Sequence, residues 1–283
     1  MPALPPLLLD GRPPVASDLD WLLASRALAF GEGVFTTARV FQGQVVFLDA
    51  HLHRLQNALA ALRYAPSNFD WQVLRSEIQE SGLKLEQGML KVMLLAGSGQ
   101  GGYRRDKNQK WHRLVHPRRF ELNLAAYAGV HCWWQACSGD NPATASKHLN
   151  RLSQVLASER CPSNYVEALQ YNTQGIINEA IARTIFWYAQ GRWYTPALST
   201  GAMAGVMRRQ ILEHLGSKQV QEVVANFAIL QEAQEVFICN SLQGIWPVLS
   251  LNTAQGRIAS WDSGAHTRQL MAVFHPSLGL PIA

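Results

Sequence analysis

Alternating apolar and polar positions mark a strand early in the chain. The segment 35–41 has a period of two, which places Phe35 and Thr37 on one face and Thr36 on the other. The Gln-Gly dipeptide at 42–43 is typical of a tight turn, and the apolar run at 45–48 that follows it is expected to be the return strand. The pattern therefore predicts a β-hairpin, although threonines are common in strands for their β-propensity alone.

A stripe of leucines follows at helical spacing. The segment 52–62 repeats leucine every three or four positions, and Asp49 is a good N-cap for such a helix. Arg54 lies on this helix, where an arginine is most simply a solvated or ion-paired side chain. His51 and His53 diverge at their spacing on a helix, so we interpret them as surface or helix-packing histidines rather than a metal pair.

A buried strand and a glycine-rich loop come next. Residues 89–95 are apolar over a length typical of a buried strand, and the loop at 97–103 lacks the Gly-Lys-Ser/Thr ending of a P-loop. Arginines and lysines then gather between 104 and 119. Such a run is most simply a solvated loop, and Trp111 is its only aromatic residue within 107–119, so base stacking has little support.

The second half of the chain has the pattern of hairpins followed by helices. Strand-like runs at 166–169 and 176–177 flank one turn, and 184–188 is followed across another by 192–195. Gly205 precedes a helical segment, and a closing amphipathic helix follows further on. The start of a helix offers unpaired N–H groups and a favourable dipole to an anion, although this one is equally interpretable as a plain helix start.

Composition allows more than one domain. The chain has 283 residues, of which 48% are hydrophobic and 16% charged, which is enough apolar material for one large or two modest domains. The periodic pattern is lost near 121–129, so we expect domains at 1–125 and 126–283. The formal charge of +5 fits small anionic ligands and is weak for a nucleic-acid binder.

Cysteine usage and the N-terminal residues bear on compartment. The four cysteines have no metal-site spacing and are most simply free thiols in a reducing cytoplasm. The short run Leu7-Leu8-Leu9 has no basic segment before it, and no apolar run is long enough to span a membrane. We therefore expect a cytoplasmic protein with no metal site, no membrane contact and no nucleic-acid partner.

One lysine stands at a change of pattern. Lys147 lies between the turn-rich segment 139–142 and an apolar run that begins at Leu149. We expect it where an ordered loop or strand end enters a helix. A lysine in such a place is usually a solvated surface charge, so its neighbours must decide whether it has a chemical role.

Those neighbours give the chain a family resemblance. Lys-His-Leu-Asn-Arg-Leu at 147–152, followed by Asn-Glu-Ala at 178–180, resembles the catalytic core of the fold-type-IV pyridoxal-phosphate enzymes, the class IV aminotransferase family. The resemblance runs from about Leu9 to about Trp261. It implies an α+β fold with a smaller N-terminal α/β domain and a larger, β-barrel-like C-terminal domain with helices, and it implies a homodimer.

The resemblance also implies a site for pyridoxal 5'-phosphate. Such a site needs an amine for the aldehyde, an acid for the ring nitrogen and an anion pocket for the phosphate. Lys147 would bind the aldehyde, and Glu179 would keep the ring nitrogen protonated. The implied phosphate ligands are the Arg54 guanidinium, the backbone at Val206 and Met207, and the hydroxyl of Ser241.

A second motif favours one branch of the family. Phe-Thr-Thr-Ala-Arg at 35–39 resembles the aminodeoxychorismate lyases more than the transaminases. This likeness implies conversion of 4-amino-4-deoxychorismate to 4-aminobenzoate and pyruvate, a step of folate biosynthesis, with Thr37, Lys147 and Glu179 in catalysis. The implied substrate-binding residues are Phe35, Tyr103, Arg104 and Arg105.

Two positions depart from the family pattern. Ala96 stands where the lyases commonly carry an arginine, and Thr184 stands where asparagine is usual. Arg104 or Arg105 is our candidate to replace the missing cation at the substrate carboxylates. A transaminase for branched-chain or D-amino acids would share the same lysine and glutamate, and a non-enzymatic basic binding protein is the alternative from another class.

Overall fold

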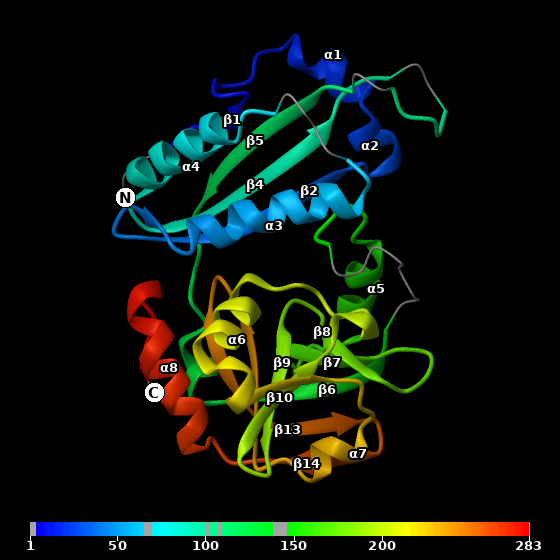
Figure 1. Ribbon diagram of the computed structural model, residues 1–283, viewed down its shortest axis with the longest axis vertical. Helices are drawn as coiled ribbons and strands as arrows, with labels where there is room; N and C mark the ends of the chain where they lie inside the picture. Colours follow the sequence, from blue (N-terminus) through cyan, green and yellow to red (C-terminus); the bar gives the residue numbers. More distant parts are fainter. Residues whose placement is uncertain (1–3, 65–68, 100–101, 107–108, 138–145, 283) are drawn as a thin grey trace. The chain divides into compact units, whose positions relative to one another are not determined.

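The chain divides into two units in a computed structural model that describes residues 4–64, 69–99, 102–106, 109–137 and 146–282. The first unit is Met1–Glu121 with Ser146–Asn150, and the second is Leu122–Ala145 with Arg151–Ala283 (Figure 1). The boundary predicted after residue 125 lies near the first of these divisions. The grouping of Ser146–Asn150 with the first unit was not predicted. The turn-rich segment expected at 139–142 lies outside the described residues.

The first unit is built on a five-stranded antiparallel sheet in the order β1-β5-β4-β2-β3. The predicted alternation in β2 is confirmed, because Thr36 is fully buried while Phe35 and Thr37 are only partly buried. The strands are β1 (Leu8–Leu9), β2 (Gly33–Phe41), β3 (Gln44–Val45), β4 (Gly88–Ala96) and β5 (Trp111–Arg118).

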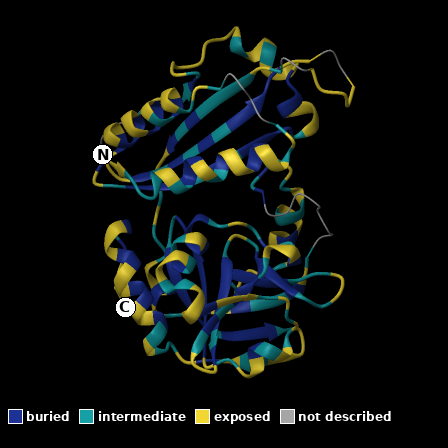
Figure 2. Ribbon diagram, viewed as in Figure 1, coloured by how far each residue is buried: buried dark blue, intermediate teal, exposed yellow. Residues whose placement is uncertain are grey.

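Two helices cover one face of this sheet. Leu55 of α3 and Leu74 of α4 join Val34 and Val92 of the sheet in one buried cluster, and the outer faces of both helices are exposed (Figure 2). This is the amphipathic arrangement that the leucine stripe predicted. The helices of the unit are α1 (Asp18–Leu23), α2 (Arg26–Phe30), α3 (Leu48–Ala61) and α4 (Trp71–Leu85).

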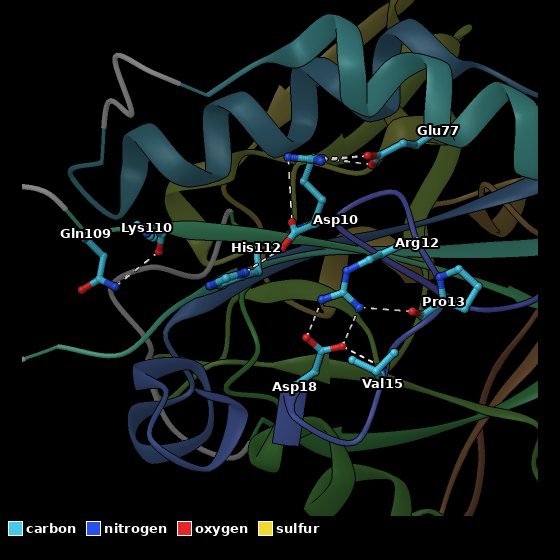
Figure 3. Close-up of polar contacts among 10 residues, drawn as sticks. Asp10, Arg12, Pro13, Val15, Asp18, Glu77, Gln109, Lys110 and His112 are labelled. Carbon is cyan, nitrogen blue, oxygen red and sulfur yellow. Dashed lines mark hydrogen bonds and ion pairs between the residues drawn. The ribbon is translucent and has the colours of Figure 1, made fainter. Parts of the chain in front are cut away.

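A carboxylate ties the first strand to the rest of the unit. Asp10 lies 2.7 Å from Nδ1 of His112 and accepts the backbone N–H of Arg113 at 2.8 Å, and Arg113 donates to Glu77 of α4 at 2.8 Å (Figure 3). Burial raises the pKa of Asp10, but these donors and the nearby positive charges outweigh it and leave the pKa below its ordinary value. The interaction therefore stabilises the fold above about pH 4 and is lost as the pH falls further.

The second unit is built on a nine-stranded curled sheet in the order β11-β10-β9-β12-β13-β6-β7-β8, with β14 paired to β13. Both predicted hairpins, β7–β8 and β9–β10, are present. The strands are β6 (Val130–Ala136), β7 (Glu167–Tyr171), β8 (Ile177–Ala180), β9 (Thr184–Ala189), β10 (Arg192–Pro196), β11 (Val220–Val223), β12 (Glu235–Asn240), β13 (Gly244–Thr253) and β14 (Gly256–Ser260).

Helices surround this sheet, and the predicted closing helix is one of them. Both units mix helices and strands, as the predicted α+β class requires. None of the helices in the described part of the chain is long and apolar enough to cross a membrane. The helices are η1 (Leu124–Ala128), α5 (Leu152–Arg160), η2 (Leu198–Thr200), α6 (Val206–Gln219), α7 (Ala228–Gln231) and α8 (Ala265–Leu278).

Three local predictions were wrong, each at an element boundary. Asp49 is not an N-cap, because α3 begins at Leu48 with Phe47 as its cap in the left-handed region (φ 58°). The return strand of the first hairpin is only Gln44–Val45, since the helix starts so soon after it. The helix after Lys147 begins at Leu152 rather than Leu149, because Leu149 takes part in backbone pairing described below.

His275 fastens the C-terminal segment to the second sheet. The side chain is fully buried, its Nε2 accepts the N–H of Ile245 at 2.9 Å, and its Nδ1 lies 2.5 Å from the carbonyl oxygen of Pro281. An imidazole that accepts at one nitrogen and donates at the other must be neutral. Burial accordingly lowers the pKa of His275, more than the bond to Pro281 raises it.

We expect His275→Phe to lower the free energy of unfolding by about 1–3 kcal/mol at pH 7.5, because the buried N–H of Ile245 loses its acceptor. Urea unfolding measures this loss, with His53→Gln, at an exposed histidine of α3, as the control. Near pH 6.5 the unfolded chain binds a proton at His275, whereas the folded chain does not. Wild type should therefore lose stability as the pH falls, and the difference in unfolding free energy between wild type and His275→Phe should become smaller. If this difference becomes larger below pH 6.5, His275 is not a neutral imidazole in the folded protein.

Candidate active site

The segment that carries Lys147 pairs with strand β2. The N–H of Phe35 donates to the carbonyl oxygen of Lys147 at 2.8 Å, and the N–H of Leu149 donates to that of Gly33 at 3.0 Å. Val34 and His148 form the antiparallel bridge between these two bonds. Lys147 is therefore held by backbone hydrogen bonds beside the Phe-Thr-Thr sequence, which explains why it belongs to the first unit.

Two glycines permit this close pairing. A Cβ atom at Gly33 would lie 2.7 Å from a Leu149 methyl carbon and 2.7 Å from the Leu94 carbonyl oxygen, and one at Gly31 would lie 2.0 Å from Oδ1 of Asn150. Gly31 also has a positive φ of 62°. The two glycines on either side of Glu32 thus make room for the lysine segment.

Two lysine side chains reach the same aromatic ring. The Nζ atoms of Lys147 and Lys91 lie 4.9 Å and 5.1 Å from the centroid of the Phe35 ring. Lys91 stands opposite Thr37 in the β2–β4 ladder, so the two side chains share one face of the sheet. Phe35, Thr37 and Lys147, predicted separately, therefore come together, and Lys91 joins them.

Arg54 lies on α3 on the other side of β2, one turn after His51. The imidazole of His51 is 1% exposed, and its Nδ1 is 2.6 Å from Oγ1 of Thr36. Burial, with smaller effects from the charges of Arg54 and Lys147, lowers the pKa of His51 to about 3. His51 was interpreted as an ordinary histidine, but it is a neutral, buried group close to two predicted site residues.

Glu32 organises the loop after β4. Its carboxylate accepts from Nε of Arg26 at 2.5 Å and also pairs with Arg105. Arg26 donates in addition to the carbonyl oxygens of Gly102 and Tyr103, at 2.7 and 3.2 Å. Arg26 and Glu32 are buried, whereas the Tyr103 side chain is 89% exposed. A buried ion pair thus fixes the backbone of a loop that presents an exposed tyrosine.

The predicted substrate arginines differ in their surroundings. Arg105 pairs with Glu32, donates to the carbonyl oxygen of Leu62 at 2.6 Å, and stacks 4.5 Å from the ring centroid of Tyr64. Arg104 is exposed. A cavity of about 440 Å³ lies here within the first unit. Its lining includes Phe30, Tyr103, Arg105, His148 and Asn150.

In the second unit, Glu179 lies on β8 and is 8% exposed. Its Oε2 accepts the backbone N–H of Met203 at 3.0 Å, in the segment that leads into α6. Arg151 is within electrostatic reach: burial lowers the pKa of this guanidinium, and the charge of Glu179 opposes that effect. The carboxylate predicted for the ring nitrogen is therefore tied to the predicted phosphate-binding helix.

The start of α6 has the features of an anion site. Gly205 is the N-cap in an extended conformation with no side-chain capping bond, so the N–H groups at Val206 and Met207 are not capped by the side chain before them. A Cβ at Gly205 would lie 3.0 Å from Oγ1 of Thr184, which shows how closely β9 approaches the helix start. Ser241 follows the end of β12 and is 9% exposed.

The predicted residues thus fall into two groups, one in each unit. The first unit holds Phe35, Thr37, Arg54, Tyr103, Arg104, Arg105 and Lys147, and the second holds Glu179, Val206, Met207 and Ser241. Among the residues that the structure describes, no cluster of three or more histidine, cysteine, aspartate or glutamate side chains could hold a metal ion. Lys91 and His51 are the residues that reasoning from the sequence missed, since only the sheet register and the helix packing bring them to the other residues.

Sequence comparison relates the chain to enzymes of two activities. An aminodeoxychorismate lyase of Vibrio harveyi is 30% identical over 255 residues, which cover 88% of this chain and 93% of the relative. A branched-chain-amino-acid aminotransferase of Escherichia coli K12 is 26% identical over 270 residues, which cover 88% of this chain and 85% of the relative.

Comparison with solved structures gives the same two groups. The 4-amino-4-deoxychorismate lyase of Pseudomonas aeruginosa has a TM-score of 0.84 and 28% identity, over 95% of this chain and 98% of that one. The branched-chain aminotransferase of Escherichia coli has a TM-score of 0.78 at 20% identity, over 96% of this chain and 94% of that one, which shows the shared fold. The sequence model described as amino-transferase class IV matches residues 33–251, and the chain therefore belongs to the class IV aminotransferase family.

Proposed function

We propose that this protein is a pyridoxal-phosphate-dependent lyase that converts 4-amino-4-deoxychorismate to 4-aminobenzoate and pyruvate. The observation that carries the proposal is the pairing of the Lys147 segment with β2, which brings Nζ of Lys147 within 4.9 Å of the Phe35 ring in the Phe-Thr-Thr sequence. The lyase relative in Vibrio harveyi, at 30% identity over 88% of this chain, supports it.

The residues fit pyridoxal 5'-phosphate as cofactor. When bound, this group supplies an aldehyde that an amine can hold and a ring that accepts the electrons of a breaking bond. Lys147 would hold the aldehyde, and the buried Glu179 would hold a proton at the ring nitrogen. The phosphate would be bound by Arg54, by the uncapped N–H groups at Val206 and Met207 next to Gly205, and by Ser241.

The side chains around Phe35 would then act on the substrate. Lys147, released as a neutral amine, would remove the proton from the ring carbon beside the substrate amine. The hydroxyl of Thr37 would orient the Lys147 amine or donate a hydrogen bond to the oxygen of the leaving enolpyruvyl group. The enolpyruvyl group leaves as enolpyruvate, which takes up a proton to become pyruvate, and the ring left behind is aromatic, which makes the step strongly downhill.

Positive side chains would bind the two carboxylates of the substrate. Lys91 shares a sheet face with Thr37, so we add it to the proposed residues Tyr103 and Arg104. Arg105 would act indirectly, because its guanidinium is held by Glu32 and by the Leu62 carbonyl.

We also propose a cytoplasmic homodimer. Large apolar side chains on α1 and α2 are exposed in the single chain, with Leu19 at 55%, Leu23 at 63% and Leu28 at 59%. Surfaces of this kind commonly mark contacts between copies of a protein. No disulfide joins the cysteines at 132, 137, 161 and 239 in the part of the chain that the structure describes, which fits a reducing compartment. Light scattering measures the assembly directly.

Transaminase activity is the second candidate, because the branched-chain aminotransferase relative is similar over nearly the same length. We expect the purified protein to form 4-aminobenzoate and pyruvate from 4-amino-4-deoxychorismate, and to transfer little or no amine from branched-chain or D-amino acids to 2-oxoglutarate. Borohydride reduction followed by peptide mapping should place the cofactor on Lys147. Label on another lysine, or amine transfer without pyruvate, would exclude the proposal.

Thr37→Val should separate the two activities, because it removes a hydroxyl with little change of shape. We expect pyruvate release to slow roughly tenfold to a hundredfold, which corresponds to about 1.4–2.7 kcal/mol, while cofactor absorbance is retained. Thr253→Val, in the hairpin between β13 and β14, is the matched control. An unchanged rate would remove the reason for preferring a lyase to a transaminase.

Lys91→Met should raise KM about tenfold with a smaller change in kcat, because a charge-assisted contact to a carboxylate contributes about 1.5–3 kcal/mol. Lys84→Met, on the exposed face of α4, is the control for loss of a lysine charge. Arg104→Ala tests the loop in the same assay. If Lys91→Met has no effect and Arg104→Ala raises KM, the carboxylate contact belongs to the loop and not to the sheet.

A further inference from the structure

A polar pair lies inside the apolar layer of the first unit. Thr36 is fully buried, His51 is 1% exposed, and Oγ1 of Thr36 is 2.6 Å from Nδ1 of His51. Leu55 on the same helix and Val34 on the same strand belong to the buried apolar cluster of this unit. Burial of polar groups costs free energy unless they are hydrogen-bonded, so this contact fixes one position of the helix against the strand.

The charge state of His51 follows from its surroundings. The imidazole is neutral at pH 7, because burial first, and then the charges of Arg54 and Lys147, lower its pKa to about 3. A proton on Nδ1 is favoured over one on Nε2, because a buried N–H at Nε2 would have no acceptor in the described part of the chain. Nδ1 then donates to Oγ1 of Thr36. Nε2 is buried and makes no hydrogen bond to the part of the chain that the structure describes.

The pair connects four residues proposed for the active site. Arg54 lies one turn after His51 on α3, so the two side chains are neighbours on the helix. Phe35 and Thr37 stand on either side of Thr36 along β2, and the N–H of Phe35 donates to the Lys147 carbonyl. The His51–Thr36 contact is thus a polar link from the helix that carries the arginine to the strand that pairs with the lysine segment.

We propose that His51 is a positioning residue: as a neutral imidazole bonded to Thr36, it fixes the helix with Arg54 against the strand that carries Thr37 and pairs with Lys147. This inference rests on the proposed function only in that these residues bind a phosphate-bearing cofactor. Active-site groups displaced by about 1 Å can lose a hundredfold in rate, so a single contact that sets this spacing matters for both binding and turnover.

Three substitutions separate the contact from the volume of the side chain. His51→Asn places an amide nitrogen near the position of Nδ1 and can keep the bond to Thr36. His51→Gln reaches toward Nε2 instead, and His51→Leu fills the space without any polar group. His53→Leu, on the exposed side of the same helix, is the matched control.

We expect His51→Leu to weaken pyridoxal phosphate binding and to lower kcat, each about tenfold, and Thr36→Val to do the same. The double variant should be no worse than either single one, because both remove one interaction. His51→Asn should stay within about threefold of wild type in both measurements, and His51→Gln should resemble His51→Leu. Cofactor affinity is measured by absorbance titration, and folding by the thermal midpoint of the cofactor-free protein.

A second readout needs no cofactor. Nitrogen NMR of ¹⁵N-histidine-labelled protein should show His51 neutral and protonated at Nδ1 from pH 8 to pH 5, with His51→Asn identifying its signal. The proposal is overturned if His51 titrates near pH 6.5, if additive single effects appear in the double variant, or if folded His51→Leu has wild-type affinity and kcat. A loss of thermal stability alone, with cofactor affinity unchanged, also overturns it.

The two proposals can fail separately. If the cofactor binds with an affinity that depends on His51 but 4-aminobenzoate is not formed, the lyase assignment is wrong and the role of His51 stands. If 4-aminobenzoate is formed at the wild-type rate by His51→Leu, the lyase assignment stands and the positioning role is wrong. Failure of the wild-type protein to bind pyridoxal phosphate rejects both.

Discussion

Backbone pairing between the segment Ser146–Asn150 and strand β2 is the constraint on which the chemistry proposed for the first unit depends. Two N–H···O bonds, at 2.8 and 3.0 Å, hold the lysine by its main chain, so its position does not depend on a side-chain contact that a point mutation could remove. Gly31 and Gly33 are necessary because any side chain there would enter the space of Asn150 or Leu149. The lysine segment therefore packs directly against the glycines and the Phe-Thr-Thr sequence, although more than a hundred positions separate it from them in the sequence.

In each unit a buried carboxylate fixes the position of a backbone segment. Glu32 joins Arg26 to Arg105 and so determines the path of the loop that presents Tyr103. Glu179 accepts the Met203 N–H and so joins β8 to the segment before α6. A carboxylate with a structural bond of this kind is held in one orientation, which is what a partner for a ring nitrogen needs. Its removal would disturb the neighbouring backbone as well as the chemistry.

Local pattern predicted some of the elements, whereas others, such as α4, β5 and β6, were not predicted. The alternation in β2, the leucine stripe of α3, both C-terminal hairpins and the last helix follow from residues within a few positions of one another, and all were confirmed. The start of α3 was misplaced because Phe47, an unusual cap, ends the turn after β3. Lys91 was missed because its relation to Thr37 is set by the register of β4, which no local pattern contains. His51 was missed because a histidine in an amphipathic helix gives no sign of what it packs against.

Strand β2 also limits which insertions, deletions and substitutions the protein can tolerate. Its two faces serve different purposes, since Thr36 bonds to His51 in the core and Thr37 stands opposite Lys91 on the other side. Because successive side chains alternate, an insertion or deletion of one residue within Gly33–Phe41 would exchange the two faces along everything that follows it. Substitutions in the strand alter one contact at a time, whereas a single-codon change in length would move the core residues into the site and the site residues into the core. A change in the length of the strand is therefore more disruptive than most changes in its composition.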